Sequence, residues 1–124
     1  MSLSTRDLVL RHWQLANAHE WVAFARLLHP ALVYEAPQSR ERIRGALGYV
    51  DYYATWPQPW RVEVQKCIAD DAGAMTRIDF VSSAPTMTGL TIFDIQDGLI
   101  ARVTDYWPDP YEPGPRASVH VERY

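Results

Sequence analysis

The sequence predicts a single α+β domain in which three N-terminal helices pack on a curved antiparallel sheet that closes around one small-molecule pocket. The main observation is a change of hydrophobic period. Apolar residues recur at helical spacing up to about residue 56 and alternate with polar residues from Trp60 onward. Helices followed by a run of hairpin-linked strands are typical of α+β domains. A chain of 124 residues has room for one such domain.

Three segments carry the apolar spacing and the end signals of helices. The first is expected at residues 6–16. The second is expected at residues 19–28, where His29-Pro30 ends it because the residue before a proline disfavours helical backbone. The third is expected at residues 46–56 and is stopped by Pro57.

One strand is predicted between the second and third helices, at residues 31–36, followed by a short extended piece that reaches Ile43. Four strands follow the third helix. The turn sequences Asp70-Asp71-Ala72-Gly73 and Gln96-Asp97-Gly98 predict hairpins between them. The four later strands are expected at residues 61–69, 74–82, 88–95 and 99–106.

Apolar side chains are expected on both faces of this sheet. Ile92 and Phe93 point to opposite faces, and Val103 is expected to oppose Ile100 and Tyr106 in the last strand. A sheet with two apolar faces needs cover on both. The helices cover one face, and a second copy of the chain is predicted to cover the outer face, as a homodimer.

Charge and composition exclude several classes of function. The net charge is −3 and no basic stripe is present, so nucleic acid is not expected as a partner. Cys67 is the only cysteine, which is typical of a reducing compartment. No apolar stretch is long enough for a membrane span, and a cytoplasmic location is expected. The four histidines lack ligand spacing and no phosphate-binding loop is present, so neither a metal nor a cofactor is predicted.

The chain is expected to divide into a domain at residues 1–108 and a Pro-rich extended tail at residues 109–124. Prolines at 108, 110, 113 and 115 exclude a helix there. The tail is predicted to lie extended across the domain or across its partner.

The hairpin from Thr91 to Ile100, followed by Val103-Thr104-Asp105-Tyr106-Trp107, resembles the SnoaL-like branch of the nuclear-transport-factor-2-like (NTF2-like) superfamily. The resemblance covers about residues 4–108. It implies a cone-shaped, cystatin-like α+β roll with a pocket between helices and sheet, usually in a dimer. The superfamily includes ketosteroid isomerases, polyketide cyclases, limonene epoxide hydrolases and non-catalytic binding modules, so the fold does not decide the function.

Three positions resemble the limonene epoxide hydrolases in particular. Arg77-Ile78-Asp79 matches their Arg-x-Asp, Asp105 matches the aspartate of their last strand, and Tyr34 matches a tyrosine that helps to hold the attacking water. Two departures weaken the match to epoxide hydration. Ala36 stands where those enzymes have an asparagine, and Val103 stands where they have a tryptophan.

The resemblance implies an acid–base site built from these residues. Arg77 and Asp79 share one side of a strand, and two carboxyl groups in unequal environments can hold different protonation states. Asp105 is expected to be the base and Asp79 the acid, with Arg77 orienting both and Tyr34 fixing a water or donating to an oxyanion. The alternative is that Ile78 and its neighbour Phe80 face the helices, which leaves Arg77 and Asp79 as an exposed ion pair.

The predicted ligand is a small apolar molecule with one or two oxygen atoms, held against Trp13, Tyr53, Val103 and Trp107. The chain would then be a cofactor-independent acid–base enzyme of the isomerase, cyclase or epoxide hydrolase type. The alternative is a non-catalytic module of the same fold that binds a small ligand or dimerises, in which the acidic residues order the cavity.

Overall fold

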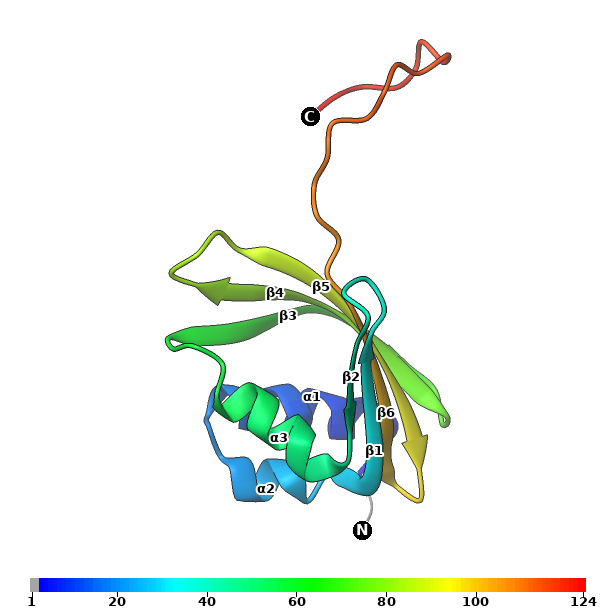
Figure 1. Cartoon of the computed structure of the whole chain (residues 1–124). Coiled ribbons are helices and arrows are strands. Elements are labelled where there is room, and N and C mark those ends of the chain that lie inside the picture. The colour runs from blue at the N-terminus through cyan, green and yellow to red at the C-terminus, as the bar shows by residue number, and fades with distance from the viewer. Residues whose placement is uncertain (1–2) are drawn as a thin grey trace.

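The computed structural model describes residues 3–124, which form three helices and one six-stranded sheet (Figure 1). The predicted α+β architecture is confirmed, and the four later strands lie within a residue or two of their predicted positions. The helices are α1 (Thr5–Asn17), α2 (Trp21–Ala25) and α3 (Ala46–Ala54). The strands are β1 (Leu28–Ala36), β2 (Glu41–Arg44), β3 (Trp60–Ala69), β4 (Gly73–Ser82), β5 (Met87–Gln96) and β6 (Leu99–Tyr106).

The strands follow the order β2-β1-β6-β5-β4-β3 across the sheet. Neighbouring strands are antiparallel, except for β1 and β6, which run parallel. The sheet is strongly curved, and the three helices lie on its concave side (Figure 1). None of these helices has the length and apolar composition that crossing a bilayer requires.

The second helix is shorter than predicted. It ends at Ala25, and Leu28 already belongs to β1, where it pairs with Ile100 of β6. The amide of Ile100 also donates to the carbonyl of Leu27 at 2.9 Å. His29-Pro30 therefore lies inside a strand and does not end a helix. Pairing with β6 outweighs the helical spacing of this segment, since tertiary contacts commonly override local propensity.

A β-bulge in β6 changes which residues face the helices. The register between β5 and β6 shifts between Asp94 and Ile95, opposite Ala101. Because of this extra residue, Ile100 and Val103 both lie in the core with no exposed surface. The prediction that Val103 and Ile100 face opposite sides of the sheet is wrong for that reason.

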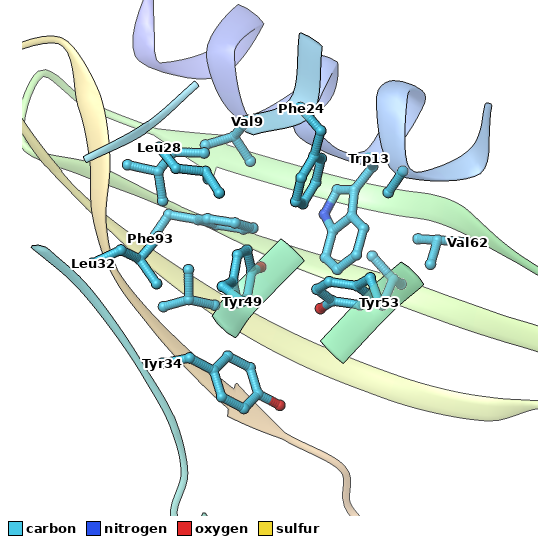
Figure 2. Close-up of a cluster of buried hydrophobic side chains, with 14 of the residues drawn as sticks. Val9, Trp13, Phe24, Leu28, Leu32, Tyr34, Tyr49, Tyr53, Val62 and Phe93 are labelled. Atoms are coloured by element: carbon cyan, nitrogen blue, oxygen red, sulfur yellow. The ribbon is translucent and has the colours of Figure 1, made fainter. Parts of the chain in front are cut away.

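Aromatic rings dominate the core between the helices and the sheet (Figure 2). Trp13 of α1 packs edge to face against Phe93 and Tyr53. His12 is also fully buried here, and its Nε2 lies 2.7 Å from the hydroxyl of Tyr49. Burial lowers the pKa of His12 to about 3, so the imidazole is neutral at physiological pH.

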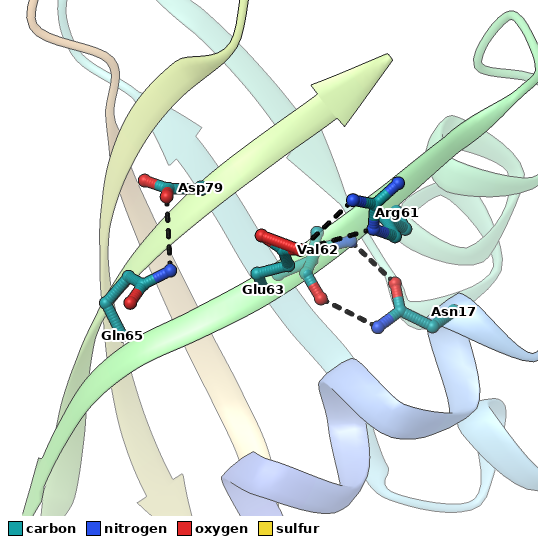
Figure 3. Close-up of polar contacts among 6 residues, drawn as sticks. All are labelled: Asn17, Arg61, Val62, Glu63, Gln65 and Asp79. Atoms are coloured by element: carbon teal, nitrogen blue, oxygen red, sulfur yellow. Dashed lines mark hydrogen bonds and ion pairs between the residues drawn. The ribbon is translucent and has the colours of Figure 1, made fainter.

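Two side chains of α1, Asn17 and Arg6, bind the free edge of β3. Figure 3 shows the contact of Asn17. The side-chain amide of Asn17 donates to the backbone carbonyl of Val62 at 2.8 Å. Its oxygen accepts from the backbone N–H of Val62 at 2.7 Å. Arg6 donates to the carbonyl of Cys67 at 2.8 Å. The helix and the edge strand are thus joined through backbone groups that no neighbouring strand uses.

After β6 the chain forms neither helix nor strand up to Tyr124. This tail projects away from its own sheet (Figure 1). The prediction that it lies across its own domain is therefore not met, and a position across a second copy remains a prediction.

Candidate functional site

A cavity of about 330 Å³ lies between α3 and the sheet. Its walls come from β1, β2 and the turn between them, from α3 and the segment that follows it, from β4 and β5, and from the residue after β6. The lining is mostly aromatic and apolar, as in most small-molecule sites. The lining residues are Tyr34, Ala36, Ser39, Glu41, Tyr52, Tyr53, Trp56, Phe80, Met87 and Trp107.

Asp105 lies behind this lining and is only 1% exposed. Its Oδ2 accepts from the Tyr34 hydroxyl at 2.9 Å and from the indole N–H of Trp107 at 3.2 Å. Its Oδ1 accepts from the Thr91 hydroxyl at 2.7 Å. Two of the three donors, Tyr34 and Trp107, line the cavity, so hydrogen bonds connect the buried carboxyl group to the cavity wall.

Burial and hydrogen bonding act in opposite directions on this carboxyl group. Desolvation raises the pKa of Asp105 above its ordinary value, and the hydrogen bonds from Thr91, Tyr34 and Trp107 oppose that rise. The pKa of Tyr34 is also raised, first by burial and then by neighbouring groups that include Asp105. Tyr34 therefore keeps its proton, and Asp105 is the member of the pair that titrates more readily.

Trp107 reaches Asp105 because β5 carries a glycine beneath its ring. A Cβ atom on Gly89 would lie 2.8 Å from Cζ3 of Trp107 and 3.1 Å from Cγ1 of Ile78. The backbone amide of Trp107 donates to the side chain of Gln38 at 2.5 Å. Trp107 is thus held by one hydrogen bond from its backbone and one from its indole ring.

Neighbouring rings of the lining meet at steep angles. Trp107 and Phe80 are at 90°, Phe80 and Trp56 at 81°, and Trp56 and Tyr52 at 64°. The three centroid separations are 5.8, 6.2 and 5.4 Å. Consecutive walls that turn through large angles enclose the space on several sides.

The structure brings together some of the predicted site residues. Tyr34 contacts Asp105, and both Trp107 and Tyr53 line the same cavity. Trp13 and Val103, which were expected to bind the ligand, are core residues with at most 1% exposed surface. Neither lies among the lining residues, because α1 and the middle of β6 are covered by other core side chains.

Arg77 and Asp79 lie on the outer face of the sheet, away from the cavity. In β4, the buried residues Thr76, Ile78 and Phe80 face the helices, so strand alternation turns Arg77 and Asp79 outward. Asp79 accepts from Gln65 at 3.1 Å on that face (Figure 3). The expected guanidinium shared between Asp79 and Asp105 is therefore absent from the site.

Sequence reasoning missed two residues of the candidate site. Thr91 stands directly opposite Asp105 in the β5–β6 pair, a relation that depends on the bulge. Glu41 places a carboxylate at the cavity from β2, a strand predicted only as an extended piece. Within residues 3–124, His, Cys, Asp and Glu side chains do not gather in a group of three that could hold a metal ion.

The chain matches the family described as SnoaL-like domain over residues 9–103. A crystal structure of a candidate ketosteroid isomerase from Kribbella flavida DSM 17836 is 34% identical, with 97% of this chain and 89% of that chain covered and a TM-score of 0.91. An NTF-2 like protein of unknown function from Burkholderia xenovorans LB400 is 22% identical, with coverages of 97% and 94% and a TM-score of 0.80.

A third solved structure, an LEH-like epoxide hydrolase from M. tuberculosis, is 18% identical, with coverages of 86% and 84% and a TM-score of 0.71. Identities of 22% and 18% show a shared fold and no more. No curated protein matches the chain. The SnoaL-like match spans most of the sequence, and the solved structures share the fold of this chain along most of its length. The chain therefore belongs to the SnoaL-like domain family.

Proposed function

We propose that the chain binds a small, largely apolar, oxygen-bearing molecule in this cavity and acts on it by acid–base catalysis without a cofactor. The reaction would be of the isomerase, cyclase or epoxide hydrolase type, as resemblance to the candidate isomerase and the LEH-like hydrolase suggests. The observation that carries the proposal is the buried Asp105, which is hydrogen-bonded to two residues of the cavity lining. Asp79 and Arg77 have no part in it.

The geometry supports a two-proton relay through Tyr34. When Asp105 is ionised, the Tyr34 hydroxyl donates to it and the lone pair of the phenol oxygen is free to accept. A proton taken from carbon or water by that oxygen is balanced by transfer of the Tyr34 proton to Oδ2 of Asp105. The ligand then carries the negative charge, Tyr34 is again a neutral phenol, and Asp105 is a neutral acid.

The two transfers are proposed to be concerted. The raised pKa of Tyr34 makes a separate phenolate costly, so Tyr34 cannot lose its proton first. Once Asp105 is protonated, it donates to the Tyr34 oxygen, which turns the Tyr34 hydrogen toward the cavity and stabilises an enolate or alkoxide. The reverse relay returns the proton at another carbon of the ligand, which is an isomerisation.

Hydrogen–deuterium exchange into a panel of β-keto compounds, with terpene epoxide opening as a parallel assay, tests the relay. The comparison is between wild type, Asp105→Asn and Tyr34→Phe. General acid–base groups contribute about 100- to 10,000-fold, so both variants are expected to lose at least about 100-fold.

Asp79→Asn is the matched control, because it makes the same substitution on the outer face of the sheet, and it is expected to keep the wild-type rate. Equal rates in wild type and Asp105→Asn would contradict the relay. An equal loss in Asp79→Asn would contradict the placement of catalysis in the cavity.

A non-catalytic binding module is the second candidate, and one observation favours it. Both oxygens of Asp105 are already occupied by three donors within the protein, as expected for a carboxyl group that orders the cavity wall. Saturable binding of panel compounds, detected by tryptophan fluorescence, without turnover in any assay would favour this alternative.

We also propose a homodimer through the outer face of the sheet. Three apolar side chains lie side by side on that face, one on each of β3, β4 and β5. They are Ile68, Met75 and Ile92, which are 53%, 39% and 37% exposed. Leu90 and Tyr106 continue the apolar area along β5 and β6. A second copy placed here would remove this surface from water.

Sedimentation velocity at micromolar concentration tests the dimer. Ile92→Lys on the outer face is expected to shift the protein to a monomer. Leu47→Lys, which changes an 84% exposed leucine on α3, is expected to leave the dimer intact. A wild type that sediments as a monomer would contradict the proposal.

A further inference from the structure

The cavity combines aromatic walls with negative charge. Six of its ten lining side chains are aromatic. The faces of such rings carry negative electrostatic potential, which attracts cations and repels anions. The steep angles between Trp107, Phe80, Trp56 and Tyr52 place these rings as successive walls of one box. A box of this kind is the arrangement by which proteins bind alkylated ammonium groups.

The charged groups at the cavity have one sign. Glu41 contributes a carboxylate to the lining, and Asp105 lies directly behind Tyr34 and Trp107. Among residues 3–124, the side chains that line the cavity include no lysine, arginine or histidine. An anionic ligand would therefore meet the carboxylate of Glu41, with Asp105 behind the wall, and no compensating cation in the lining.

The carboxylate of Glu41 is available to a ligand. Within the described chain it makes no ion pair or side-chain hydrogen bond, whereas the neighbouring Arg42 is bound to Glu35 at 2.7 and 3.0 Å. Glu35 also binds Arg102, which keeps these charges on the outer face. The charge of Glu41 lies close enough to Tyr52 to contribute, after burial and Asp105, to the raised pKa of that phenol.

We infer that the ligand of this cavity carries a positively charged nitrogen, so that the molecule taken up is an alkylated or cyclic amine. The ammonium group would lie inside the box of Tyr52, Trp56, Phe80 and Trp107, with Glu41 as its counter-charge. The inference rests on the proposed function, because it concerns the same cavity. It narrows the ligand from an apolar oxygen-bearing molecule to one that is cationic as well.

Three probes of nearly the same shape separate charge from size. The cation is 3-hydroxyphenyltrimethylammonium, the neutral isostere is 3-tert-butylphenol, and the anion is 3-hydroxybenzenesulfonate. Dissociation constants are measured at neutral pH by ligand-observed NMR and by the intrinsic tryptophan fluorescence of the protein, to which Trp56 and Trp107 of the lining contribute. The cation is expected to bind about tenfold more tightly than the isostere, and the anion more weakly than either.

Two variants locate the effect. Glu41→Gln is expected to weaken binding of the cation several-fold and to leave the dissociation constant of 3-tert-butylphenol unchanged. Trp56→Leu keeps an apolar wall but removes an aromatic ring face. It is expected to weaken binding of the cation more than binding of the neutral isostere. Glu20→Gln, which removes one negative charge at the start of α2, is the control and is expected to change neither constant.

The possible results distinguish this inference from the proposed function. If 3-tert-butylphenol binds as tightly as the cation or more tightly, the inference of a cationic ligand is overturned. The proposed relay of Asp105 and Tyr34 is not affected by that result. Binding of none of the three probes overturns the inference as well, while the exchange assay still decides the relay. A cation preference that survives in both Glu41→Gln and Trp56→Leu would place the cation outside this cavity and contradict the inference.

Discussion

The hydroxyl of Tyr34 lies 2.9 Å from Oδ2 of Asp105, and this contact joins the first long strand of the sheet to the last. The two residues are 71 positions apart in the sequence, but β1 and β6 run side by side, and Tyr34 pairs directly with Val103. The parallel pairing of these strands therefore places a buried carboxyl group directly behind the mostly aromatic lining of the cavity.

Asp105 is expected to make stability depend on pH. An unfolded aspartate has a pKa of about 3.9, and burial raises the pKa of Asp105 in the folded protein. The folded state thus binds this proton more tightly, so the stability from Asp105 is full below about pH 4 and is lost as the pH rises through the raised pKa. Each tenfold change in proton affinity corresponds to about 1.4 kcal/mol.

Urea unfolding of wild type and Asp105→Asn between pH 4 and pH 7 measures this effect. The difference in the free energy of unfolding, wild type minus variant, is expected to fall as the pH increases. A difference that stays constant across the range would show that the carboxyl group titrates alike in the folded and unfolded chains.

Tyr34→Phe is expected to destabilise the protein by about 1–3 kcal/mol at neutral pH, because it leaves a buried carboxylate short of one donor. Tyr106→Phe removes the same hydroxyl from the partly exposed outer face and is the control. In an Asp105→Asn background the loss caused by Tyr34→Phe should shrink. Additive losses in the double variant would indicate that the two side chains are not coupled.

Gly89→Ala is expected to push the indole of Trp107 away from β5. The new methyl group would lie 2.8 Å from the ring, and overpacking of this kind costs about 1–3 kcal/mol. Both the free energy of unfolding and the near-UV circular dichroism of tryptophan should change. Gly114→Ala adds the same methyl group where nothing lies within 4 Å, and no change is expected there.

His12 is expected to remain neutral down to low pH. Its lowered pKa of about 3 compares with about 6.5 in an unfolded chain. The stability it contributes is therefore present above pH 6.5 and is lost as the pH falls toward 3, because only the unfolded state takes up the proton. The Cε1–H NMR signal of His12 should not move between pH 8 and pH 5. A midpoint near pH 6.5 would refute burial of this imidazole.

Local signals in the sequence predict most of the fold. The helical spacing of residues 6–16 gives α1, and the alternation after Trp60 together with Gln96-Asp97-Gly98 gives the hairpin of β5 and β6. Each of these elements is specified by residues close together in the chain. The parallel contact of β1 with β6 has no such local signal, because it depends on the curvature of the whole sheet.

The site was harder to predict because it depends on strand phase. Counting back from the turn of the last hairpin pairs Thr91 with Thr104, but the bulge at Ala101 shifts the register so that Thr91 meets Asp105. For Arg77 and Asp79, alternation with Ile78 predicts an outward position, and the resemblance to the epoxide hydrolases argued for the opposite. The alternation was right, since core packing fixes which side of a strand faces the helices.

The contacts that α1 makes with β3 limit how this protein can associate. An open edge strand presents unpaired N–H and C=O groups onto which another chain can add a strand. Asn17 occupies both backbone groups of Val62, and Arg6 occupies the carbonyl of Cys67. At the opposite edge, β2 is four residues long and three of them are charged. Continuous sheets across two molecules and fibril growth by strand addition are therefore disfavoured, which leaves the convex face of the sheet as the surface for the proposed homodimer.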